Sequence, residues 1–353
     1  MKKSKRILTI IIVVFMIIVT LTDCSKKAVS TITTQGKPVK VAVFLLDFTD
    51  DFISLIRKNL EDIQKENPDN VEYTFYDGKS NQAIQNEELD NVLKEGTDLI
   101  LLNIVNIEDS QAVINRVKET NTPVILFNRE PVTSVLIQSY DKALYIGTDA
   151  KQAGITQGKM VVDAWNTSKK YIDKNNDGIM QYVMLEGEIN SKEAIERTKY
   201  SILTIEDADI KTQQLALTVC NWLEDLAYNA IKSLFLKYGN QIEVIIANDD
   251  TMAIGAIKAL QEYGYNNGDK SKTIPVVGVD VTPDAKELIE KGDMLGSVFQ
   301  DPRAYEEALY TCGMNLVAGK SPVDGTKYKL DDTGVAIRLP QTDYLYKNMF
   351  VSM

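Results

Sequence analysis

Residues 242–250 have the sequence Ile-Glu-Val-Ile-Ile-Ala-Asn-Asp-Asp, an apolar run that ends in an amide and two carboxylates. A pattern typical of a helix follows directly, over residues 250–262. Continuous apolar runs of this length, separated by helices, indicate parallel strands that are buried on both faces. The chain repeats this arrangement from residue 39 onward, and we expect strands at 39–47, 71–77, 98–105, 123–128, 143–147, 182–186, 243–247, 275–279 and 295–299.

Helical patterns lie between these runs, and several of them open with an Asp or Ser suited to capping a helix N-terminus. Strands and helices alternate throughout the body of the chain. This order predicts an α/β fold of two lobes, each a doubly wound parallel sheet, with the break near residues 147–149. The expected helices are 51–66, 109–120, 149–165, 191–205, 250–262 and 301–316.

Polar side chains follow most of the predicted strands within a few residues. The carboxyl ends of the strands line the ligand crevice in open parallel sheets, so these side chains are candidates for binding. Helix capping is the alternative explanation, and it suits Asp149, Asp250 and Asp301 better than it suits Asn128 or the carboxylates at positions 249 and 280. The full set is Asp50, Asn103, Asn128, Asp149, Glu188, Asp249, Asp280 and Asp301.

The composition is that of an ordinary globular protein. The chain has 353 residues, 44% hydrophobic and 25% charged, and this length suggests two domains. It contains no histidine, which excludes Ser-His-Asp and Cys-His catalysis and every metal site that needs an imidazole. Because 50 acidic residues outnumber 39 basic ones, electrostatics argues against nucleic acid as a partner.

The N-terminus has the features of a secretory signal, since a basic start is followed by about 15 apolar residues. That run is short for a membrane-spanning helix of about 20 residues, although an uncleaved anchor is the alternative. We predict a lipoprotein signal peptide at 1–23 and lipidation of Cys24, while Asp23 departs from the small residue usual before such a cysteine. Removal of the signal peptide at 1–23 takes away four positive charges and one negative charge, so the net charge of the protein falls from −11 to −14. The mature protein would lie outside the cytoplasmic membrane, joined to its anchor by a flexible tether at 24–39.

Two cysteines, Cys220 and Cys312, remain after the predicted lipidation site. An oxidising compartment would permit a disulfide between them. Cysteines this far apart are more often separate buried thiols, and we expect both to be free.

The most specific local motif is Asp-Lys-Asn-Asn-Asp-Gly-Ile-Met-Gln at 173–181. Oxygen side chains at positions 1, 3, 5 and 9, a glycine at position 6 and a backbone carbonyl at position 7 are typical of an EF-hand-type calcium loop. Position 12, which should hold a bidentate glutamate, is Met184, so the last carboxylate must come from elsewhere. A metal-free turn is the alternative. The predicted ligands in the loop are Asp173, Asn175, Asp177, the Ile179 carbonyl and Gln181.

No catalytic motif has the required spacing. Residues 313–321 resemble a phosphate loop, but five residues rather than four separate the glycines. The sequence leaves open whether two carboxylates form a catalytic pair for glycoside hydrolysis. The remaining candidates are ligand-holding groups: carboxylates, amides and arginines can bond vicinal hydroxyls, and aromatic rings can cover a pyranose. They are Asp50, Phe52, Asn128, Arg129, Arg197, Trp222, Asp249 and Asp280.

Several stretches are together specific to one family: 52–58, 123–131, 140–143, 145–149, 173–181, 242–250 and 276–280. Through them the chain, from residue 41 to about residue 340, resembles the bacterial galactose/glucose-binding proteins, which are periplasmic binding proteins of the first structural type. LacI-type repressors share this fold, but a secretory signal here replaces their DNA-binding headpiece. The resemblance implies two lobes joined by a multi-strand hinge. Their expected ranges are 40–147 with about 304–335, and 148–303 with about 338–353.

The resemblance also implies roles for the residues at matching positions. Asp50, Asn128, Arg197 and Asp280 would bond sugar hydroxyls, Phe52 and Trp222 would sandwich the pyranose, and Glu243 would supply the missing calcium carboxylate. Four further pocket positions depart from the family pattern, namely Ser191, Glu193, Asp249 and Gln300. They leave the identity of the sugar open, and so acidic a set would admit a different pyranose or an amino sugar.

The function implied by the resemblance is that of a lipid-anchored, monomeric subunit of an ABC sugar importer, not an enzyme. It would bind a monosaccharide such as galactose or glucose, close on it, and present the closed form to a membrane permease with its ATPase. A protein that signals to a chemoreceptor or sensor kinase would use the same cleft. A glycosidase is the third class, and turnover of aryl glycosides would identify it.

Overall fold

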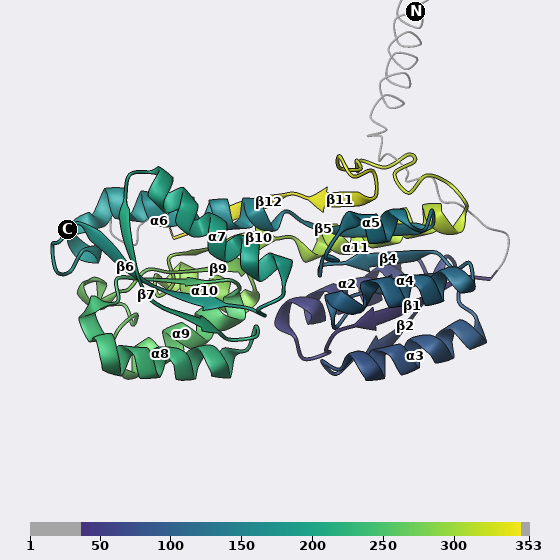
Figure 1. The fold of residues 1–353 in the computed structure, drawn as a ribbon. Coiled ribbons are helices and arrows are strands. Elements are labelled where there is room, and N and C mark those ends of the chain that lie inside the picture. Colours follow the sequence, from purple (N-terminus) through teal and green to yellow (C-terminus); the bar gives the residue numbers. More distant parts are fainter. Residues whose placement is uncertain (1–36, 347–353) are drawn as a thin grey trace, which may run out of the picture. The chain divides into compact units, whose positions relative to one another are not determined.

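The computed structural model describes residues 37–346, and the strands in this range form two six-stranded sheets (Figure 1). Their strand orders are β11-β5-β4-β3-β1-β2 and β12-β10-β9-β8-β6-β7. Neighbouring strands are parallel, except that β12 runs antiparallel to β10. The predicted signal peptide, Cys24 and most of the tether lie outside the described residues. Within those residues, no helix is long and apolar enough to cross a membrane.

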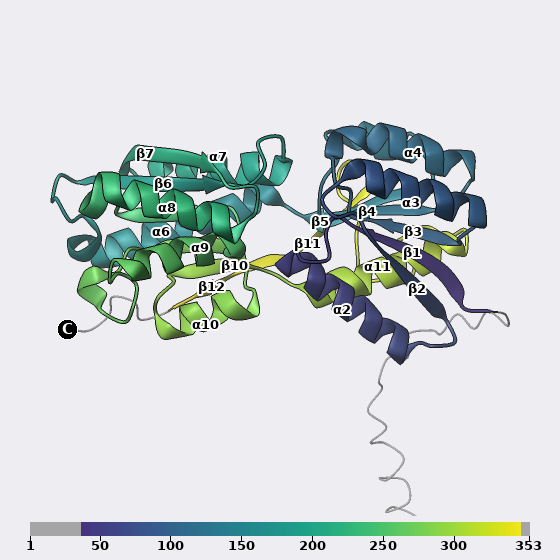
Figure 2. The same ribbon diagram turned by 90° about the horizontal axis from the view of Figure 1, so that it is seen from below.

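The first lobe contains the sheet of β1 (Val39–Leu45), β2 (Val71–Asp77), β3 (Leu99–Leu102), β4 (Val124–Phe127), β5 (Ala143–Thr148) and β11 (Ala336–Leu339). Helices cover both of its faces, as Figure 2 shows. Val43 faces the layer of α2 (Asp51–Glu66) and α11 (Pro302–Val317). Its neighbour Phe44 faces α3 (Gln82–Glu95), α4 (Ser110–Glu119) and α5 (Ser134–Gln138), because successive side chains of a strand alternate between faces.

The second lobe contains β6 (Ile179–Glu186), β7 (Lys211–Val219), β8 (Val244–Ala247), β9 (Val276–Asp280), β10 (Gly296–Gln300) and β12 (Gln341–Leu345). One face packs against α6 (Ala150–Ile172) and α7 (Lys192–Asp207). The other packs against α8 (Glu224–Tyr238), α9 (Asp250–Glu262) and α10 (Pro283–Lys291). Both sheets are thus covered on two faces, and the predicted doubly wound α/β fold is confirmed.

The chain passes between the two sheets at three places: after β5, after β10, and between β11 and β12. The first crossing falls where the break was predicted. Only Pro340 separates the last two strands. Because β11 pairs with β5, the first lobe extends to Leu339 rather than to about residue 335.

Strand β7 is an element that the apolar pattern did not predict. It pairs only with β6 at the edge of its sheet, and most of its residues are at least partly exposed. Polar residues such as Gln213 and Gln214 are therefore tolerated in it. An edge strand of this kind has no continuous apolar run for a sequence analysis to detect.

Both cysteines are free and fully buried, as predicted. Cys220 lies in the apolar cluster of α8 and α9, whereas Cys312 lies in the cluster of α2 and α11. Burial raises the pKa of the Cys220 thiol to about 11 and that of the Cys312 thiol to about 12, so neither is a reactive thiolate near neutral pH.

Candidate functional site

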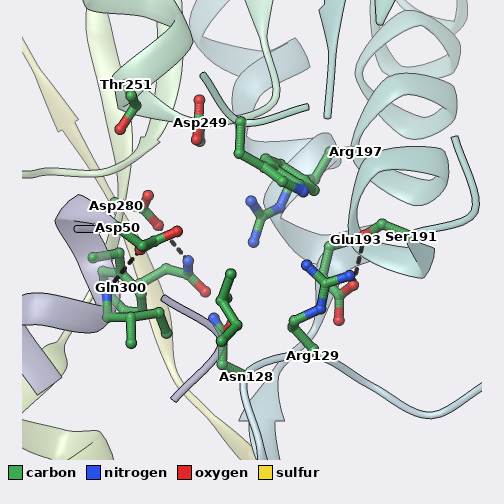
Figure 3. A pocket seen from close by; sticks show the side chains of 14 residues that line it. Asp50, Asn128, Arg129, Ser191, Glu193, Arg197, Asp249, Thr251, Asp280 and Gln300 are labelled. Atoms are coloured by element: carbon green, nitrogen blue, oxygen red, sulfur yellow. Dashed lines mark hydrogen bonds between the residues drawn. The ribbon is translucent and has the colours of Figure 1, made fainter. Parts of the chain in front are cut away.

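One pocket brings together all ten side chains predicted to bind substrate (Figure 3). Its cavity volume is about 60 Å³, smaller than the roughly 300–1,000 Å³ typical of small-molecule sites. The first lobe contributes three of the ten, after β1 and β4, and the second lobe contributes seven. The ten are Asp50, Phe52, Asn128, Ser191, Glu193, Arg197, Trp222, Asp249, Asp280 and Gln300.

Four further residues line the pocket. Arg129 follows Asn128 directly and was among the sequence candidates, but it was not assigned to the site. Leu46, Ile53 and Thr251 were missed. Each lies within four residues of a predicted member, so proximity to a strand end was the signal that could have found them.

Helix capping accounts for part of the geometry of two pocket carboxylates. Asp50 Oδ1 accepts a hydrogen bond from the Ile53 N–H (2.8 Å), and Asp249 Oδ1 accepts one from the Met252 N–H (2.8 Å). The capping prediction is correct for Asp149 and Asp301. It is wrong for Asp250, because Asp249 caps α9.

Asp250 is instead a fully buried brace. Its carboxylate accepts hydrogen bonds from the Thr282 N–H (2.9 Å) and from the Ser297 hydroxyl (2.6 Å). These contacts join the start of α9 to the residues just after β9 and to the start of β10. They hold the backbone just beyond Asp280.

The backbone is strained at three pocket residues, where φ is +63° at Asn128, +63° at Trp222 and +121° at Asp280. Val281, which follows, has φ +57°. Such conformations cost on the order of 1–3 kcal/mol each for residues other than glycine, and they gather at ligand-binding sites. These backbone conformations orient the three side chains toward the pocket, and no sequence pattern predicts them.

Asn128 is oriented by its neighbours in the first lobe. Asn103 Nδ2 donates to Asn128 Oδ1 (3.2 Å), and the Tyr145 hydroxyl donates to the Asn128 carbonyl (2.9 Å). The amide NH₂ group of Asn128 is left as a donor for a ligand.

Asp280 is tied to the crossings between the lobes through Gln300. Gln300 Nε2 donates to Asp280 Oδ1 (2.5 Å), while its Oε1 accepts from the Thr148 hydroxyl (2.5 Å) and from Gln341 Nε2 (3.4 Å). Thr148, Gln300 and Gln341 lie at the three crossings. Gln300 therefore orients Asp280, and both the amide nitrogen and the amide oxygen of Gln300 have hydrogen-bond partners within the protein.

Two aromatic rings border the pocket. The Trp222 ring lies against Gly187, where an added Cβ would come within 2.2 Å of Trp222 Cζ2, so only glycine leaves room for this ring position. The Arg197 guanidinium carbon is 6.0 Å from the centre of the Trp222 ring. Phe52 is mostly buried and makes an edge-on contact with Tyr305 (5.7 Å), so it also belongs to the core of the first lobe.

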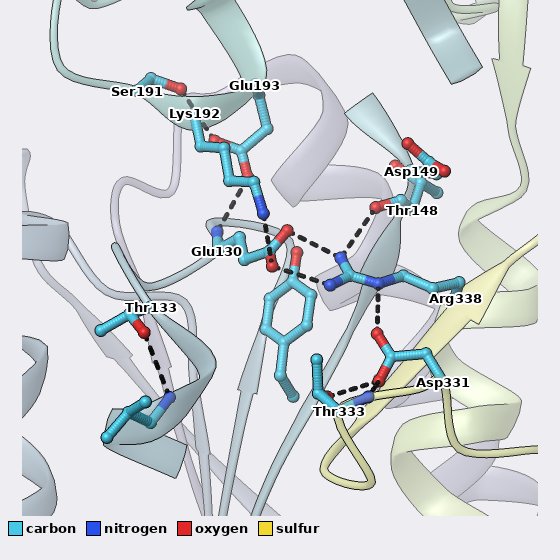
Figure 4. Close-up of polar contacts among 12 residues, drawn as sticks. Glu130, Thr133, Thr148, Asp149, Ser191, Lys192, Glu193, Asp331, Thr333 and Arg338 are labelled. Atoms are coloured by element: carbon cyan, nitrogen blue, oxygen red, sulfur yellow. Dashed lines mark hydrogen bonds and ion pairs between the residues drawn. The ribbon is translucent and has the colours of Figure 1, made fainter. Parts of the chain in front are cut away.

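Ser191 and Glu193 line the pocket, but their polar atoms are engaged within the protein (Figure 4). The Ser191 hydroxyl donates to Glu193 Oε2 (2.8 Å) and accepts from the Ala194 N–H (3.3 Å). Glu193 Oε1 accepts from the Glu130 N–H (2.8 Å). These contacts join α7 of the second lobe to the loop after β4 of the first.

Ion pairs reinforce this junction. Glu130 pairs with Lys192 (2.8 Å) and with Arg338 of β11 (2.7 Å). Burial raises the pKa of Glu130, but hydrogen bonds from Arg338 and Lys192 outweigh it and hold the pKa below its ordinary value. Arg129 and Glu188 form a further bidentate pair, at 3.1 and 2.5 Å. The pairs of Glu130 with Lys192 and of Arg129 with Glu188 bridge the two lobes beside the pocket, whereas the pair of Glu130 with Arg338 lies within the first lobe.

Burial dominates the electrostatics of the pocket carboxylates. It raises the pKa of Asp50 to about 6 and that of Asp280 to about 7, against the lowering effects of hydrogen bonds and of Arg129 or Arg197. It raises the pKa of Asp249 well above the ordinary value, and the charge of Asp280 adds to this shift. The pocket therefore favours protonated carboxyls or a cationic partner.

The predicted calcium loop forms a compact turn between α6 and β6. The Gly178 N–H donates to Asp173 Oδ2 (3.0 Å), and the Asp177 N–H donates to Asn175 Oδ1 (2.9 Å). Gly178 has φ +77°, a conformation that glycine adopts without strain. Glu243, predicted as the distant carboxylate, lies against the loop and accepts from the backbone N–H groups of Lys174 (2.8 Å) and Gln181 (3.1 Å).

The residues of this loop fit a calcium ion by their chemistry. Asp173 is buried, and its Oδ1 has no hydrogen-bond partner. Burial raises the pKa of Glu243 to about 7, and the charges of Asp173 and Asp177 add to this shift. Within residues 37–346, no three Asp, Glu or Cys side chains form a metal-binding cluster by themselves. The loop would add two amide oxygens and one carbonyl, the ligand types that calcium accepts.

The profile of the periplasmic binding protein domain matches residues 41–321. The chain belongs to this family. It is 34% identical over 299 residues to the D-galactose/methyl-galactoside binding periplasmic protein of Haemophilus influenzae, covering 84% of this chain and 87% of that protein. It is 24% identical over 276 residues to the ribose import binding protein of Escherichia coli, covering 75% and 83%. The family predicted from the sequence is confirmed.

A solved structure supports the fold of this periplasmic binding protein. An ABC transporter solute binding protein from Bacillus halodurans, with bound myo-inositol, superposes with a TM-score of 0.72. The two sequences are 22% identical, and the match covers 90% of this chain and 98% of the other. The predicted periplasmic binding protein type 1 fold is therefore confirmed.

Proposed function

We propose that the protein is the extracytoplasmic substrate-binding subunit of an ABC sugar importer and that it binds a monosaccharide of the galactose/glucose type. The observation that carries this proposal is the pocket. Carboxylates, an amide and arginines from both lobes converge there beside two aromatic rings. A pyranose needs polar groups for its hydroxyls and an apolar surface for its C–H faces. The relative from Haemophilus influenzae, named for galactose binding, supports the same ligand class.

The protein acts by closing on its ligand rather than by catalysing a reaction. A sugar that touches both lobes favours the closed form over the open one, because only the closed form makes both sets of contacts. The ion pairs of Glu130 with Lys192 and of Arg129 with Glu188 would form in the same closing movement. The closed form is what a membrane permease and its ATPase would recognise. In this proposal the protein is a monomer held at the membrane by a lipid on Cys24.

A thermal-shift screen tests the ligand. We expect D-galactose or D-glucose to raise the melting temperature, because a ligand stabilises the folded state by about 2.7 kcal/mol at a hundredfold excess over Kd. Mannitol serves as the control, since it has hydroxyls but no ring to lie between Phe52 and Trp222. A melting temperature that no monosaccharide changes would contradict the proposed function.

We propose further that the 173–181 loop binds a structural calcium ion through Asp173, Asn175, Asp177, Gln181, the Ile179 carbonyl and Glu243. The ion would neutralise the three carboxylates and join the end of α6 to the start of β6. The loop contributes no residue to the sugar pocket. Its role would therefore be stability rather than recognition.

Removal of calcium tests this site. We expect chelation by EDTA to lower the melting temperature and to change sugar affinity much less. The Glu243→Gln variant should lose most of its response to added calcium, since it lacks the bidentate carboxylate. Asp163→Asn, which removes an exposed charge from α6, should respond as the parent does. Identical melting curves with and without EDTA, and no calcium by elemental analysis, would refute the site.

A further inference from the structure

The pocket holds more negative charge than its own cations balance. Four carboxylates line it, while its basic residues are Arg129 and Arg197. Arg129 is already paired with Glu188, and Arg197 Nη1 donates to the Asn248 carbonyl (2.9 Å). Among residues 37–346, no Lys or Arg forms an ion pair with any of the four, which are Asp50, Glu193, Asp249 and Asp280.

The four carboxylates differ in what they can offer a ligand. Both oxygens of Glu193 are engaged, and Asp280 already receives the Gln300 amide. Asp50 and Asp249 each use one oxygen to cap a helix. Asp249 is only 7% exposed and has no cation beside it, so ionising it in the closed pocket is costly unless a positive group arrives.

From this imbalance we propose that the preferred ligand is a pyranose carrying a protonated amine, with the ammonium group bound at Asp249. This inference rests on the proposed sugar-binding function and narrows it. An ammonium group provides both the charge and up to three N–H donors. The carboxylates that face Asp249 across the pocket, Asp50 and Asp280, favour the same cation.

A second observation indicates that the rest of the ligand carries hydroxyl groups. The Nε atoms of Arg129 and Arg197 are buried without an acceptor, although both side chains line the pocket (Figure 3). Arg197 is 4% exposed. An unsatisfied buried N–H costs about 1–3 kcal/mol, and hydroxyl oxygens of a bound sugar would relieve that cost. A simple amine without hydroxyls would leave both groups unpaired.

The pKa of Asp249 agrees with this assignment. Burial raises it well above the ordinary value, and the charges of Asp280, Asp50 and Asp250 add to the shift. Such a shift favours the protonated form of the carboxyl when no cation is near. The bound ammonium group would allow it to ionise and to form a charge-assisted hydrogen bond.

Calorimetry at pH 7 compares each amino sugar with the neutral hexose of the same shape: D-galactosamine with D-galactose, and D-glucosamine with D-glucose. We expect at least one amino sugar to bind about tenfold or more tightly than its neutral counterpart, which corresponds to about 1.4 kcal/mol. In Asp249→Asn this preference should fall to less than about threefold. Asparagine also caps helices well, so the start of α9 is kept. The control Asp163→Asn should keep the preference of the parent.

Each outcome decides a different point. If the parent binds the neutral hexoses as tightly as their amino forms, the inference is overturned while the proposed function stands. If an amino sugar is preferred equally by the parent and by Asp249→Asn, the assignment to Asp249 is wrong. If no sugar of either kind binds, the proposed function fails and this inference fails with it. The comparison within the parent is decisive even if the variant does not fold.

Discussion

Replacing Trp222 with alanine is expected to weaken sugar binding at least about thirtyfold. The indole borders the pocket between Gly187 and Arg197. Truncation of a central aromatic contact typically costs about 2 kcal/mol or more, and each 1.4 kcal/mol is a factor of ten. Trp222→Phe, which keeps an aromatic ring, should lose less affinity than the alanine variant. Calorimetry with the best ligand from the thermal-shift screen measures both.

Leu223→Ala is the matched control for Trp222→Ala. Leu223 is the next residue in the same turn, is 54% exposed and does not line the pocket. We expect its affinity to equal that of the parent. If Trp222→Ala also binds like the parent while circular dichroism shows it folded, the pocket is not the sugar site.

Substitutions at Asp280 are expected to act in opposite directions on binding and on stability. Asp280→Ala removes a carboxylate that would bond sugar hydroxyls, so affinity should fall at least about thirtyfold. Asp280→Asn should instead raise the melting temperature of the unliganded protein at pH 8. The isosteric amide still accepts the hydrogen bond from Gln300. It carries no charge that burial would penalise.

The sign of the pH effect follows from the pKa of Asp280, which burial raises to about 7 from 3.8. The folded state keeps a proton that the unfolded state has already lost. The contribution of this group to stability is therefore complete below about pH 4, and it disappears as the pH rises through 7. The raised pKa of Asp50, about 6, acts in the same direction. We expect the unliganded parent to lose up to several kcal/mol between pH 4 and pH 8 from these buried acids.

Melting curves across this pH range measure the effect. Asp280→Asn should show a smaller decline than the parent. Asp284→Asn removes an exposed carboxylate four residues away and should decline as the parent does. A parent protein that becomes more stable as the pH rises from 5 to 8 would contradict the assignment of protonated carboxyls to the pocket.

The sequence alone determined the strands that are buried on both faces and much of the membership of the pocket. A strand covered by helices on two sides must be apolar along its length, so β1, β4 and β8 are visible as runs. Parallel strands end at one edge of their sheet, which is why Asp50, Asn128 and Asp280 could be assigned to one crevice. The loop at 173–181 could be proposed as a calcium site because five of its predicted ligands lie within nine residues.

Only the tertiary structure decided which carboxylate caps a helix and which one holds neighbouring strands together. The sequence pattern favoured Asp250 over Asp249 as the helix cap, whereas the packing of α9 assigns the cap to Asp249 and makes Asp250 a buried hydrogen-bond acceptor. The ion pair of Glu130 with Arg338 joins residues 208 positions apart. Hydrophobic periodicity and turn residues record local conformation. Contacts across such a separation depend on how distant segments of the chain pack together within the first lobe, and they leave no local pattern in the sequence.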